Sequence, residues 1–416
     1  MRYSALNILW NGLTGNKSWK PVWRNPEPKP EYDIIIIGGG GHGLSTAYHL
    51  AAKYGQARVA VLEKGYLGGG NVGRNTTIVR ANYMLEGNSQ FYSHSLKLWE
   101  NMEQELNYNT MMSQRGHIML AHSDGQMDAH SRRGNMMRMQ GDDADLWGRE
   151  EVRKRLPFLD HDNARFPIYG GLMHWRAGTA RHDAVAWGYA RGADQRGVDL
   201  IQNCEVTGIK IQKGRVLGVE TSRGFIGAKK VGMCAAGRSS QVGQMAGLRL
   251  PIESHVLQAF VTEGLKPVID NVISFGMGHF YISQSDKGGL VFGGDLDAYN
   301  AYGQRGNLPM VEHVAEAGMA LMPMIGKAKM LRSWGGIMDM SMDGSPIIDK
   351  TDIEGFYINC GWCYGGFKAT PASGDCFAHL LATGTHHKAA DKLVLKRFET
   401  GAVIDEEATG ATPNLH

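Results

Sequence analysis

Three glycines at a fixed spacing give the clearest chemical signal in this chain of 416 residues. Gly38, Gly40 and Gly43 form a G-x-G-x-x-G pattern directly after the apolar run 34–37. In such a turn the first glycine permits a tight bend, the second lets the backbone approach a pyrophosphate, and the third lets a helix pack against the strand. The pattern predicts a dinucleotide site at a helix start, where free amides attract phosphate.

An acidic residue stands where the ribose of such a dinucleotide would lie. The apolar run 59–62 predicts a second strand, and Glu63 follows it about 20 residues after Gly43, where a carboxylate can bind ribose hydroxyls. Because a strand, a helix and an acid all accompany the glycines, they favour a nucleotide site over an ordinary glycine turn. This pattern alone does not separate FAD from NAD.

Three cations are candidates for binding an anionic group. Lys368 follows a glycine-rich stretch that starts at Asn359, and Arg74 and Arg80 lie in the glycine- and asparagine-rich loop 66–83. An amino-acid carboxylate in a dry pocket needs a paired cation, because an unpaired buried charge is costly. We expect Lys368 to bind substrate and one arginine to bind carboxylate, while the other binds phosphate or a structural acid. A solvated surface position is the alternative for each arginine.

The five cysteines are odd in number and scattered, so the sequence predicts no disulfide framework. Cys360 and Cys363 are spaced like a thioredoxin redox pair, but they interrupt a glycine-rich loop and do not open a helix. We therefore expect no dithiol role, and the lack of a second ligand pair disfavours metal binding there. We expect three aspartates, Asp339, Asp343 and Asp349, to cap turns near residues 344–346. We do not expect them to form a paired-carboxylate site.

The expected elements indicate an α/β protein in which a Rossmann-like nucleotide domain is interleaved with a substrate domain. Helices are predicted at 44–53, 89–106, 184–195 (with Asp183 as N-cap) and 373–383, and strands at 204–211, 216–221, 230–235 and 289–293. The nucleotide domain is expected to take 32–90, 160–250 and 335–400, and the substrate or interface domain 91–159 and 251–334. Residues 1–31 are expected to form an extended arm, and 401–416 a C-terminal tail that frays from residue 405.

Bulk properties set limits on partners and location. A net charge of +3 with 20% charged residues gives no reason to expect nucleic acid as a partner. No apolar run approaches the roughly 20 residues of a membrane helix, and the N-terminus lacks the apolar core of a signal peptide. A cytoplasmic location is the resulting expectation.

Beyond these patterns, short segments along nearly the whole chain resemble one family. They are 36–44, 61–65, 74–78, 113–116, 181–187, 302–306, 334–337 and 365–368. The chain is similar to the flavoprotein amine oxidases of the D-amino-acid oxidase and monomeric sarcosine oxidase type, and more closely to the β subunits of heterotetrameric sarcosine oxidases. The resemblance implies a D-amino-acid oxidase-like fold with an antiparallel sheet in the substrate domain.

The resemblance also implies two flavins and several partners. FAD would be bound non-covalently and would oxidise sarcosine to glycine and formaldehyde, or to methylene-tetrahydrofolate. Electrons would pass to an FMN attached to His182 near Arg181 and Arg305, which would reduce O2 to H2O2. Partners would be α, γ and δ subunits, with NAD and tetrahydrofolate bound by the α subunit. Cofactor-binding residues would be Gly38, Gly40, Gly41, His42, Gly43, Glu63, Asn71, Arg74, Thr76, Thr77, Ile78, Arg181, His182, Val206, Gly361, Gly365, Gly366 and Lys368.

Two departures from the single-chain relatives bear on this expectation. Those relatives carry a lysine that promotes the oxygen reaction, and at the aligned position this chain has Val291. They also carry a cysteine that tethers the flavin, and this chain has no cysteine near the corresponding Ile337 and Met338. Both departures fit a non-covalent FAD that passes its electrons onward. The alternatives are a related FAD amine or amino-acid dehydrogenase of the dimethylglycine or opine type, or a non-catalytic flavin electron-transfer subunit.

Overall fold

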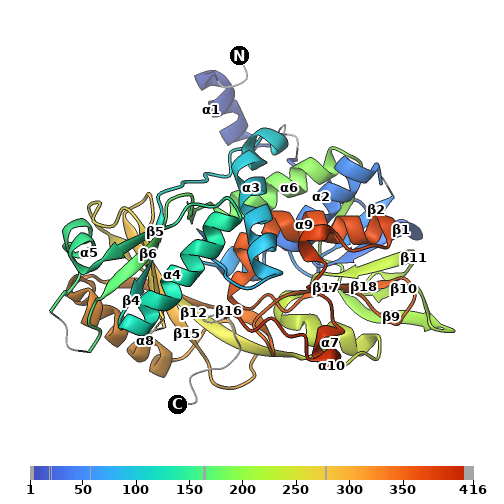
Figure 1. Cartoon of the computed structure of the whole chain (residues 1–416). Coiled ribbons are helices and arrows are strands. Elements are labelled where there is room, and N and C mark those ends of the chain that lie inside the picture. Colours follow the sequence, from blue (N-terminus) through green and yellow to red (C-terminus); the bar gives the residue numbers. More distant parts are fainter. Residues whose placement is uncertain are drawn as a thin grey trace.

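Two eight-stranded sheets organise the described part of the chain, with helices packed on their faces (Figure 1). The computed structural model describes residues 4–17, 19, 21–56, 58–162, 165–276 and 279–406. A pair of short strands, β3 (Ile78–Val79) and β7 (Gly178–Thr179), lies apart from both sheets. The α/β class and the interleaving of a nucleotide domain with a second sheet are as predicted.

The first sheet carries the nucleotide-binding turn. Its order is β17-β18-β11-β1-β2-β8, with β10 on β11 and β9 on β10. The strands are β1 (Glu31–Ile37), β2 (Val59–Leu62), β8 (Asp199–Ile201), β9 (Val206–Gln212), β10 (Arg215–Thr221), β11 (Gly224–Met233), β17 (Ile347–Lys350) and β18 (Phe356–Cys360). The β1 isoleucines 34–37 are at most 6% exposed, because helices cover both faces of this parallel core.

Four helices cover one face of this sheet and one covers the other. They are α2 (Gly41–Tyr54), α3 (Asn88–Leu106), α6 (His182–Asp194) and α9 (Gly366–Thr383) on one side, and α7 (Ser239–Met245) on the other. The amphipathic pattern predicted α3 correctly: Leu96, Trp99, Met102 and Leu106 are all buried.

Three predicted helix starts are wrong, and one of them is that of α2, which begins at Gly41 and not at residue 44. Helix α9 begins at Gly366, seven residues before the predicted start, because packing against α2 and α3 overrides the weak helix propensity of its two glycines and Pro371. Helix α6 is capped by Arg181 and not by Asp183. The Asp183 carboxylate lies in the first turn, where it accepts the Ala184 amide (2.8 Å) and pairs with Arg181.

The second sheet has the order β16-β12-β15-β14-β13-β4-β6-β5. Its strands are β4 (His117–Ala121), β5 (Asp145–Gly148), β6 (Gly170–His174), β12 (Ile252–Gly264), β13 (Val272–Phe275), β14 (Phe280–Gln284), β15 (Gly289–Leu296) and β16 (Met330–Ser341). All neighbours run antiparallel except β13 and β4. Helices α4 (Asp124–Met139), α5 (Arg149–Arg155) and α8 (Leu308–Leu321) pack beside it. Because β6 and β16 belong here, the sheets do not divide at residues 160 and 335.

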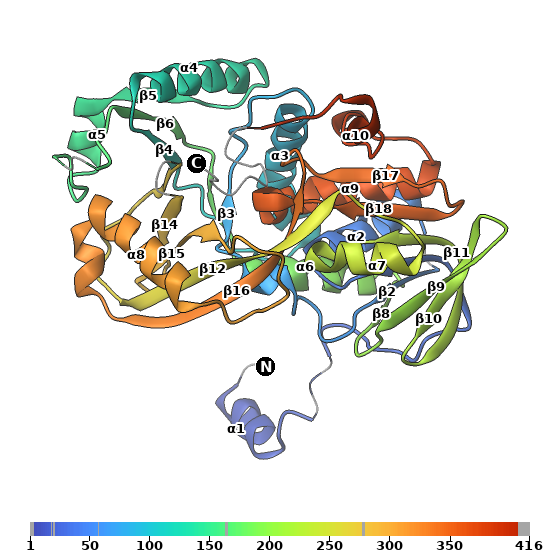
Figure 2. The same cartoon turned by 90° about the horizontal axis from the view of Figure 1, so that it is seen from below.

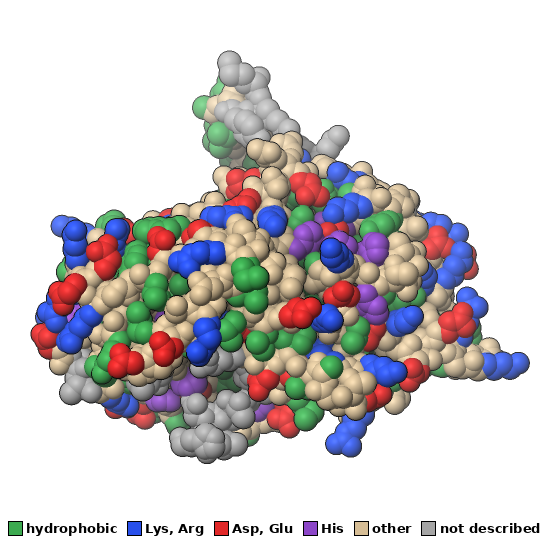
Figure 3. All heavy atoms as spheres, viewed as in Figure 1, with side chains coloured by type: hydrophobic (Ala, Val, Ile, Leu, Met, Phe, Trp, Pro, Cys, Tyr) green, Lys and Arg blue, Asp and Glu red, His purple; other side chains and the backbone are tan. Residues whose placement is uncertain are grey.

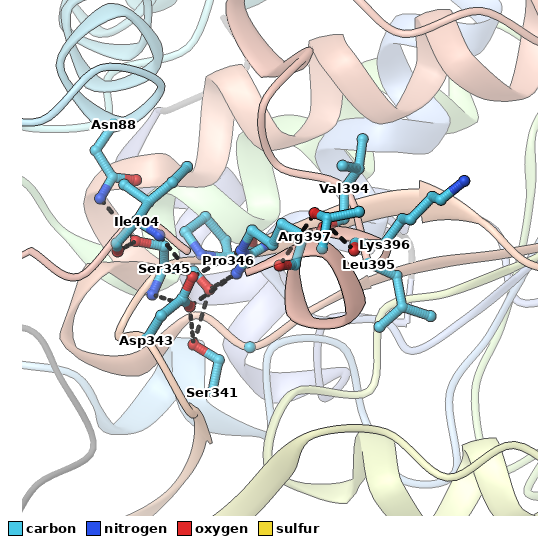
Figure 4. Close-up of polar contacts among 12 residues, drawn as sticks. Asn88, Ser341, Asp343, Ser345, Pro346, Val394, Leu395, Lys396, Arg397 and Ile404 are labelled. Atoms are coloured by element: carbon cyan, nitrogen blue, oxygen red, sulfur yellow. Dashed lines mark hydrogen bonds and ion pairs between the residues drawn. The ribbon is translucent and has the colours of Figure 1, made fainter. Parts of the chain in front are cut away.

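Buried ion pairs tie the C-terminal segment to the body of the protein. The Arg397 guanidinium, at the start of α10 (Arg397–Thr400), donates to both Asp343 oxygens (2.7 and 2.9 Å) and to the Ser345 carbonyl (Figure 4). Glu406, fully buried, pairs with Arg133 at 2.9 Å. The prediction of fraying from 405 is therefore wrong at Glu406, while 407–416 lie outside the described residues.

The N-terminal arm carries a helix, α1 (Ala5–Leu13), which stands away from the rest of the molecule (Figures 1 and 2). Its first half was expected to be extended. The Ser4 hydroxyl caps the helix by accepting the Asn7 amide (3.2 Å), and the prolines that disfavour a helix all follow it. None of the described helices is long and apolar enough to cross a lipid bilayer.

Candidate active site

A cavity of about 1110 Å³ lies between the two sheets. Its walls come from the turn after β1, the loop after β2, the segment before α7 and the first turns of α9 on the nucleotide side. The second sheet contributes β12, β14 and β16. Figure 2 shows β12 and β16 extending from the second sheet toward the nucleotide domain. Both domains thus share one site.

The glycine turn has the conformation that a dinucleotide requires. Gly38 has φ +111°, a region that favours glycine. A Cβ on Gly43 would lie 2.0 Å from the Gly38 carbonyl oxygen, so only glycine lets α2 start this close to β1. Gly40 is the N-cap of α2 and offers no side chain to the helix amides. Gly40, Gly41 and His42 line the cavity, which places the helix amides against it.

Glu63 is held at the position predicted for a ribose-binding acid. One carboxylate oxygen accepts the Gly39 amide and the other accepts the Gly65 amide, both at 2.9 Å. The carboxylate lines the cavity beside Val206. Acceptor capacity remains on each oxygen, so the group can also accept hydroxyl donors. The turn, the helix start and this acid together fit the adenosine half of a dinucleotide.

The predicted loop residues Asn71, Arg74, Thr76, Thr77 and Ile78 all line the cavity. Two of their side chains are already engaged with the backbone. The Asn71 amide bonds both polar backbone groups of Ile337 on β16, and the Arg74 guanidinium donates to the Gly69 and Gly70 carbonyls. The Asn71 bonds hold the loop against the second sheet, and the Arg74 bonds close the loop on itself.

Two cations converge on the other end of the cavity. Lys368, 6% exposed, donates from Nζ to the Tyr364 carbonyl at 2.7 Å. Burial and the charge of Arg80 lower the Lys368 pKa well below its usual value. Arg80 is half-buried, donates to the Asn82 side chain at 2.6 Å and lies over the Tyr83 ring. Both side chains line the cavity, so an anion placed there would relieve their mutual repulsion.

The start of α9 is a second helix N-terminus at the cavity, and it holds Lys368 in place. Its N-cap is Gly365, without a side-chain hydrogen bond, and Gly366 lines the cavity. The Lys368 carbonyl accepts from Ser95 Oγ (2.6 Å) and from Trp99 Nε1 (2.8 Å) of α3. This end of the cavity therefore carries the positive end of a helix dipole.

Cys360 and Cys363 are unsuited to redox exchange. Both are free and buried, and burial raises the pKa of Cys363 to about 12 and that of Cys360 well above its usual value. The expectation of no dithiol role agrees with this environment. Asp339 does not cap the 344–346 turn: its carboxylate lines the cavity, accepts the Gly361 amide at 2.7 Å and has a pKa raised by burial to about 6.

Of the other two aspartates, Asp343 caps the turn as predicted, whereas Asp349 does not. Asp343 does accept the Ser345 amide (3.2 Å), but its main partner is Arg397. Asp349 accepts the Leu395 amide and pairs with His386, both at 2.8 Å. These carboxylates fasten the C-terminal segment, because distant parts of the chain supply their partners.

Several cavity residues carry no sequence signal of their own. His117 on β4, 1% exposed, contacts Ser274 Oγ (2.9 Å), and burial together with Arg80 lowers its pKa well below the usual value. Tyr281 on β14 has a pKa raised by burial to about 12. Trp362 stacks on His42 with ring centroids 4.4 Å apart. Only the resemblance to a known family could have drawn attention to these strands, since isolated His and Tyr residues are common in cores.

His182 lies outside the cavity, as do Arg181, Gly43, Gly361 and Gly365. It is the first residue of α6, and its buried Nδ1 has no hydrogen-bond partner among the described residues. Burial lowers the His182 pKa, so the ring is neutral. The segment before it is bonded to the cavity wall, because the Ala180 amide donates to the Thr77 carbonyl (3.1 Å). A short, hydrogen-bonded segment thus connects His182 to the cavity wall.

The fold and the cavity are those of an FAD-dependent oxidoreductase, and the family model for FAD dependent oxidoreductases matches residues 33–380. Sarcosine oxidase subunit beta of Rhizobium meliloti is 69% identical over the full length of both chains. The Rhodobacter capsulatus protein of that name is 48% identical and covers 97% of this chain and 98% of its own.

A solved structure supports the same fold. L-proline dehydrogenase from P. horikoshii superposes with a TM-score of 0.83 at 26% identity, covering 90% of this chain and 99% of its own. The chain belongs to the FAD-dependent oxidoreductase family and, within it, to the sarcosine oxidase β subunits.

Proposed function

We propose that this chain is the catalytic β subunit of a multi-subunit sarcosine oxidase. N-methylglycine would give up two electrons and two protons, and water would then split the resulting imine into glycine and formaldehyde, or tetrahydrofolate would capture the carbon as the methylene derivative. The electrons would reach O2 and yield H2O2. The observation that carries the proposal is the pair of cations, Lys368 and Arg80, at one end of the cavity.

The cation pair suits an amino-acid carboxylate. Lys368 has lost nearly all contact with solvent and has the Tyr364 carbonyl as a neutral partner, so a carboxylate is the group that would best compensate its charge. Arg80 can add a second charge-assisted hydrogen bond from the neighbouring wall. Arg74, held on the Gly69 and Gly70 carbonyls, is the less suitable of the two arginines for substrate.

The same charges favour the reactive form of the amine. A positive environment lowers the pKa of a bound ammonium group, so sarcosine would lose its proton as it enters. His117 supports this, because its own pKa is held well below the usual value by burial and Arg80. Oxidation of a neutral amine needs no strong protein base, which agrees with the weakly basic side chains around Lys368.

The cavity residues fit a non-covalent FAD. Gly38 to Gly43 and Glu63 would hold the adenosine diphosphate, and the loop from Asn71 to Ile78 and the start of α9 would hold the rest. Bound FAD supplies an acceptor for two electrons. The positive end of α9 would stabilise negative charge on that acceptor.

We also propose that His182 carries the second flavin, a covalent FMN. Its ring is neutral, its Nδ1 is without a partner among the described residues, and Arg181 lies beside it to stabilise negative charge. The bonded connection through Ala180 and Thr77 to the cavity wall gives a short path between the two flavin sites. His182 is only partly buried, which agrees with a site completed by another subunit.

A denaturing precipitation of the co-expressed complex tests the two-flavin proposal. We expect FAD in the supernatant and a peptide containing His182 whose mass is increased by one FMN. In His182→Ala we expect the attached FMN to be lost and the FAD in the supernatant to remain. His313→Gln, an exposed histidine on α8, is the matched control. Release of all flavin as FAD from the wild-type complex would contradict the His182 assignment and favour a single-flavin dehydrogenase.

The protruding arm supports contact with other subunits, which we propose are α, γ and δ chains, with NAD and tetrahydrofolate sites on α. Helix α1 exposes apolar side chains that would be costly to leave in water, and some of them are visible in green at the edge of the arm in Figure 3. The exposed fractions of Leu6, Ile8, Leu9, Trp10 and Leu13 range from 60% to 79%. An apolar groove on a partner is the natural binding site for such a helix.

Removing residues 1–22 is therefore expected to weaken assembly and leave the FAD site intact. The arm lies apart from the cavity, so FAD content should stay at the wild-type level. Size-exclusion chromatography of the co-expressed subunits should show loss of the complex at low micromolar concentration. A truncated chain that assembles as well as the full chain would mean that α1 packs elsewhere.

A further inference from the structure

We propose a transition-metal site on the outer face of α9, formed by His94, Cys376 and His387. One ligand atom from each residue lies within 4.8 Å of the others. The three side chains come from α3, from α9 and from the segment just after α9. Figure 3 shows histidine side chains gathered over this part of the molecule. The site is separate from the cavity, whose walls include none of these residues.

The spacing of the ligand atoms fits a tetrahedral ion. Cys376 Sγ lies 3.5 Å from His387 Nδ1. In a tetrahedral zinc site with Zn–S of about 2.3 Å and Zn–N of about 2.0–2.1 Å, two such ligand atoms lie about 3.6 Å apart. An ion that displaces the thiol proton between these atoms therefore needs little movement of either residue. His94, with 26% of its side chain exposed, can adjust to complete a three-residue set.

The surrounding hydrogen bonds orient the rings of His94 and His387 for metal binding. His94 Nε2 lies 3.0 Å from an Asp375 oxygen, and the other Asp375 oxygen accepts from Lys53 Nζ at 2.6 Å. A carboxylate on one ring nitrogen leaves the lone pair on the other, which is the usual arrangement around metal-binding histidines. His387 Nδ1 has a lone pair that accepts the Ala389 amide (3.2 Å), and a bound ion would take the place of this hydrogen bond.

The donor set and exposure define the kind of ion. Two imidazoles and one thiolate suit Zn²⁺ or its close analogue Co²⁺, and not the oxygen-seeking Mg²⁺ or Ca²⁺. The nearby His379 does not complete the set, because its Nδ1 pairs with Tyr54 and its Nε2 contacts Thr385. Water would fill the fourth position on the solvent side. Binding of the ion would displace the Cys376 thiol proton to solvent. The bound ion would also link α3 to both ends of the segment 376–387.

Cobalt serves as the probe, since thiolate ligation gives Co²⁺ an intense near-ultraviolet charge-transfer band. The co-expressed complex is stripped with chelator, dialysed against Co²⁺ and analysed for metal content and absorption. We expect the wild-type complex to hold one more Co²⁺ per β chain than Cys376→Ser or His94→Gln. We also expect the charge-transfer band at this site to be lost in Cys376→Ser, and Zn²⁺ to displace the bound Co²⁺.

Control variants make the test specific to this cluster. His313→Gln should bind Co²⁺ as the wild type does, because that histidine lies on α8 beside Asp295. If Cys376→Ser does not assemble, His94→Gln decides the question, since this partly exposed residue tolerates replacement more readily than the buried cysteine. Equal cobalt content and equal absorption in wild type and both cluster variants would overturn the proposal.

Discussion

Replacing Lys368 by methionine is expected to lower the second-order rate constant for FAD reduction by sarcosine about 30- to 4000-fold. Methionine keeps the length of the side chain but removes the charge. Truncating one partner of a buried charge pair costs about 2–5 kcal/mol, and each 1.4 kcal/mol is a factor of ten. Lys368 is 6% exposed and Arg80 alone would remain to pair with the carboxylate at this end of the cavity, so a large loss should be seen.

Anaerobic stopped-flow spectroscopy measures this effect at the FAD absorption band. FAD content must match that of the wild type, which separates loss of substrate binding from loss of cofactor. Lys210→Met, which changes a surface lysine over the Phe225 ring, is the matched control and should react at the wild-type rate. Wild-type reduction kinetics in Lys368→Met would support the alternative in which this chain only transfers electrons.

Replacing Arg397 by methionine is expected to destabilise the chain by about 3–5 kcal/mol, the usual effect of breaking a buried ion pair from one side. The guanidinium is 1% exposed and holds Asp343 and the carbonyls of Ser345 and Pro346 (Figure 4). Without it, the Asp343 carboxylate keeps its backbone donors Ser345 and Ile404 but loses the only cation paired with it among the described residues. The cost should be far above that of a surface pair.

Urea unfolding of wild type and variant at several pH values measures this loss. Burial raises the Asp343 pKa, but the hydrogen bonds and charge of Arg397 outweigh burial and leave it lowered. The stabilisation is therefore present above the unfolded pKa of about 3.9 and is lost as pH falls through the folded pKa. Arg215→Met, whose exposed pair with Glu354 spans 3.6 Å, should cost at most about 1 kcal/mol. Equal midpoints for both variants would contradict the prediction.

The sequence predicts the nucleotide end of the site well because that chemistry is local. The strand, the three glycines, the helix and Glu63 fall within about 30 residues, and each has a separate physical requirement. Strand β2 was predicted at its observed bounds, and α3 began one residue before its predicted start. Periodicity and glycine chemistry are properties of neighbours in sequence, so no tertiary information was needed.

The substrate end could not be predicted in the same way because its parts come from distant segments. His117, Tyr281 and Asp339 reach the cavity from β4, β14 and β16. The start of α9 was missed because glycine and proline disfavour helices locally, whereas the contacts of Lys368 with Ser95 and Trp99 stabilise the helix there. The Glu406–Arg133 pair joins residues 273 positions apart, which no local pattern reveals.

The strand order of the first sheet has a consequence for synthesis on the ribosome. Strand β1 pairs with β11, and β11 pairs with β18. The strand that contains Ile35 therefore gains this neighbour only after Val231 has been translated, and the strand that contains Val231 gains its own only after Phe356. At about 5–20 residues per second, roughly 20–70 s separate the emergence of β1 from that of Glu406. Until β11 has been translated, the apolar edge of β1 has no native neighbour on one side, and from then until β18 has been translated the open edge is that of β11. Such open edges expose nascent chains to aggregation. Chaperone binding to ribosome-bound chains should therefore persist until the last strands have been translated.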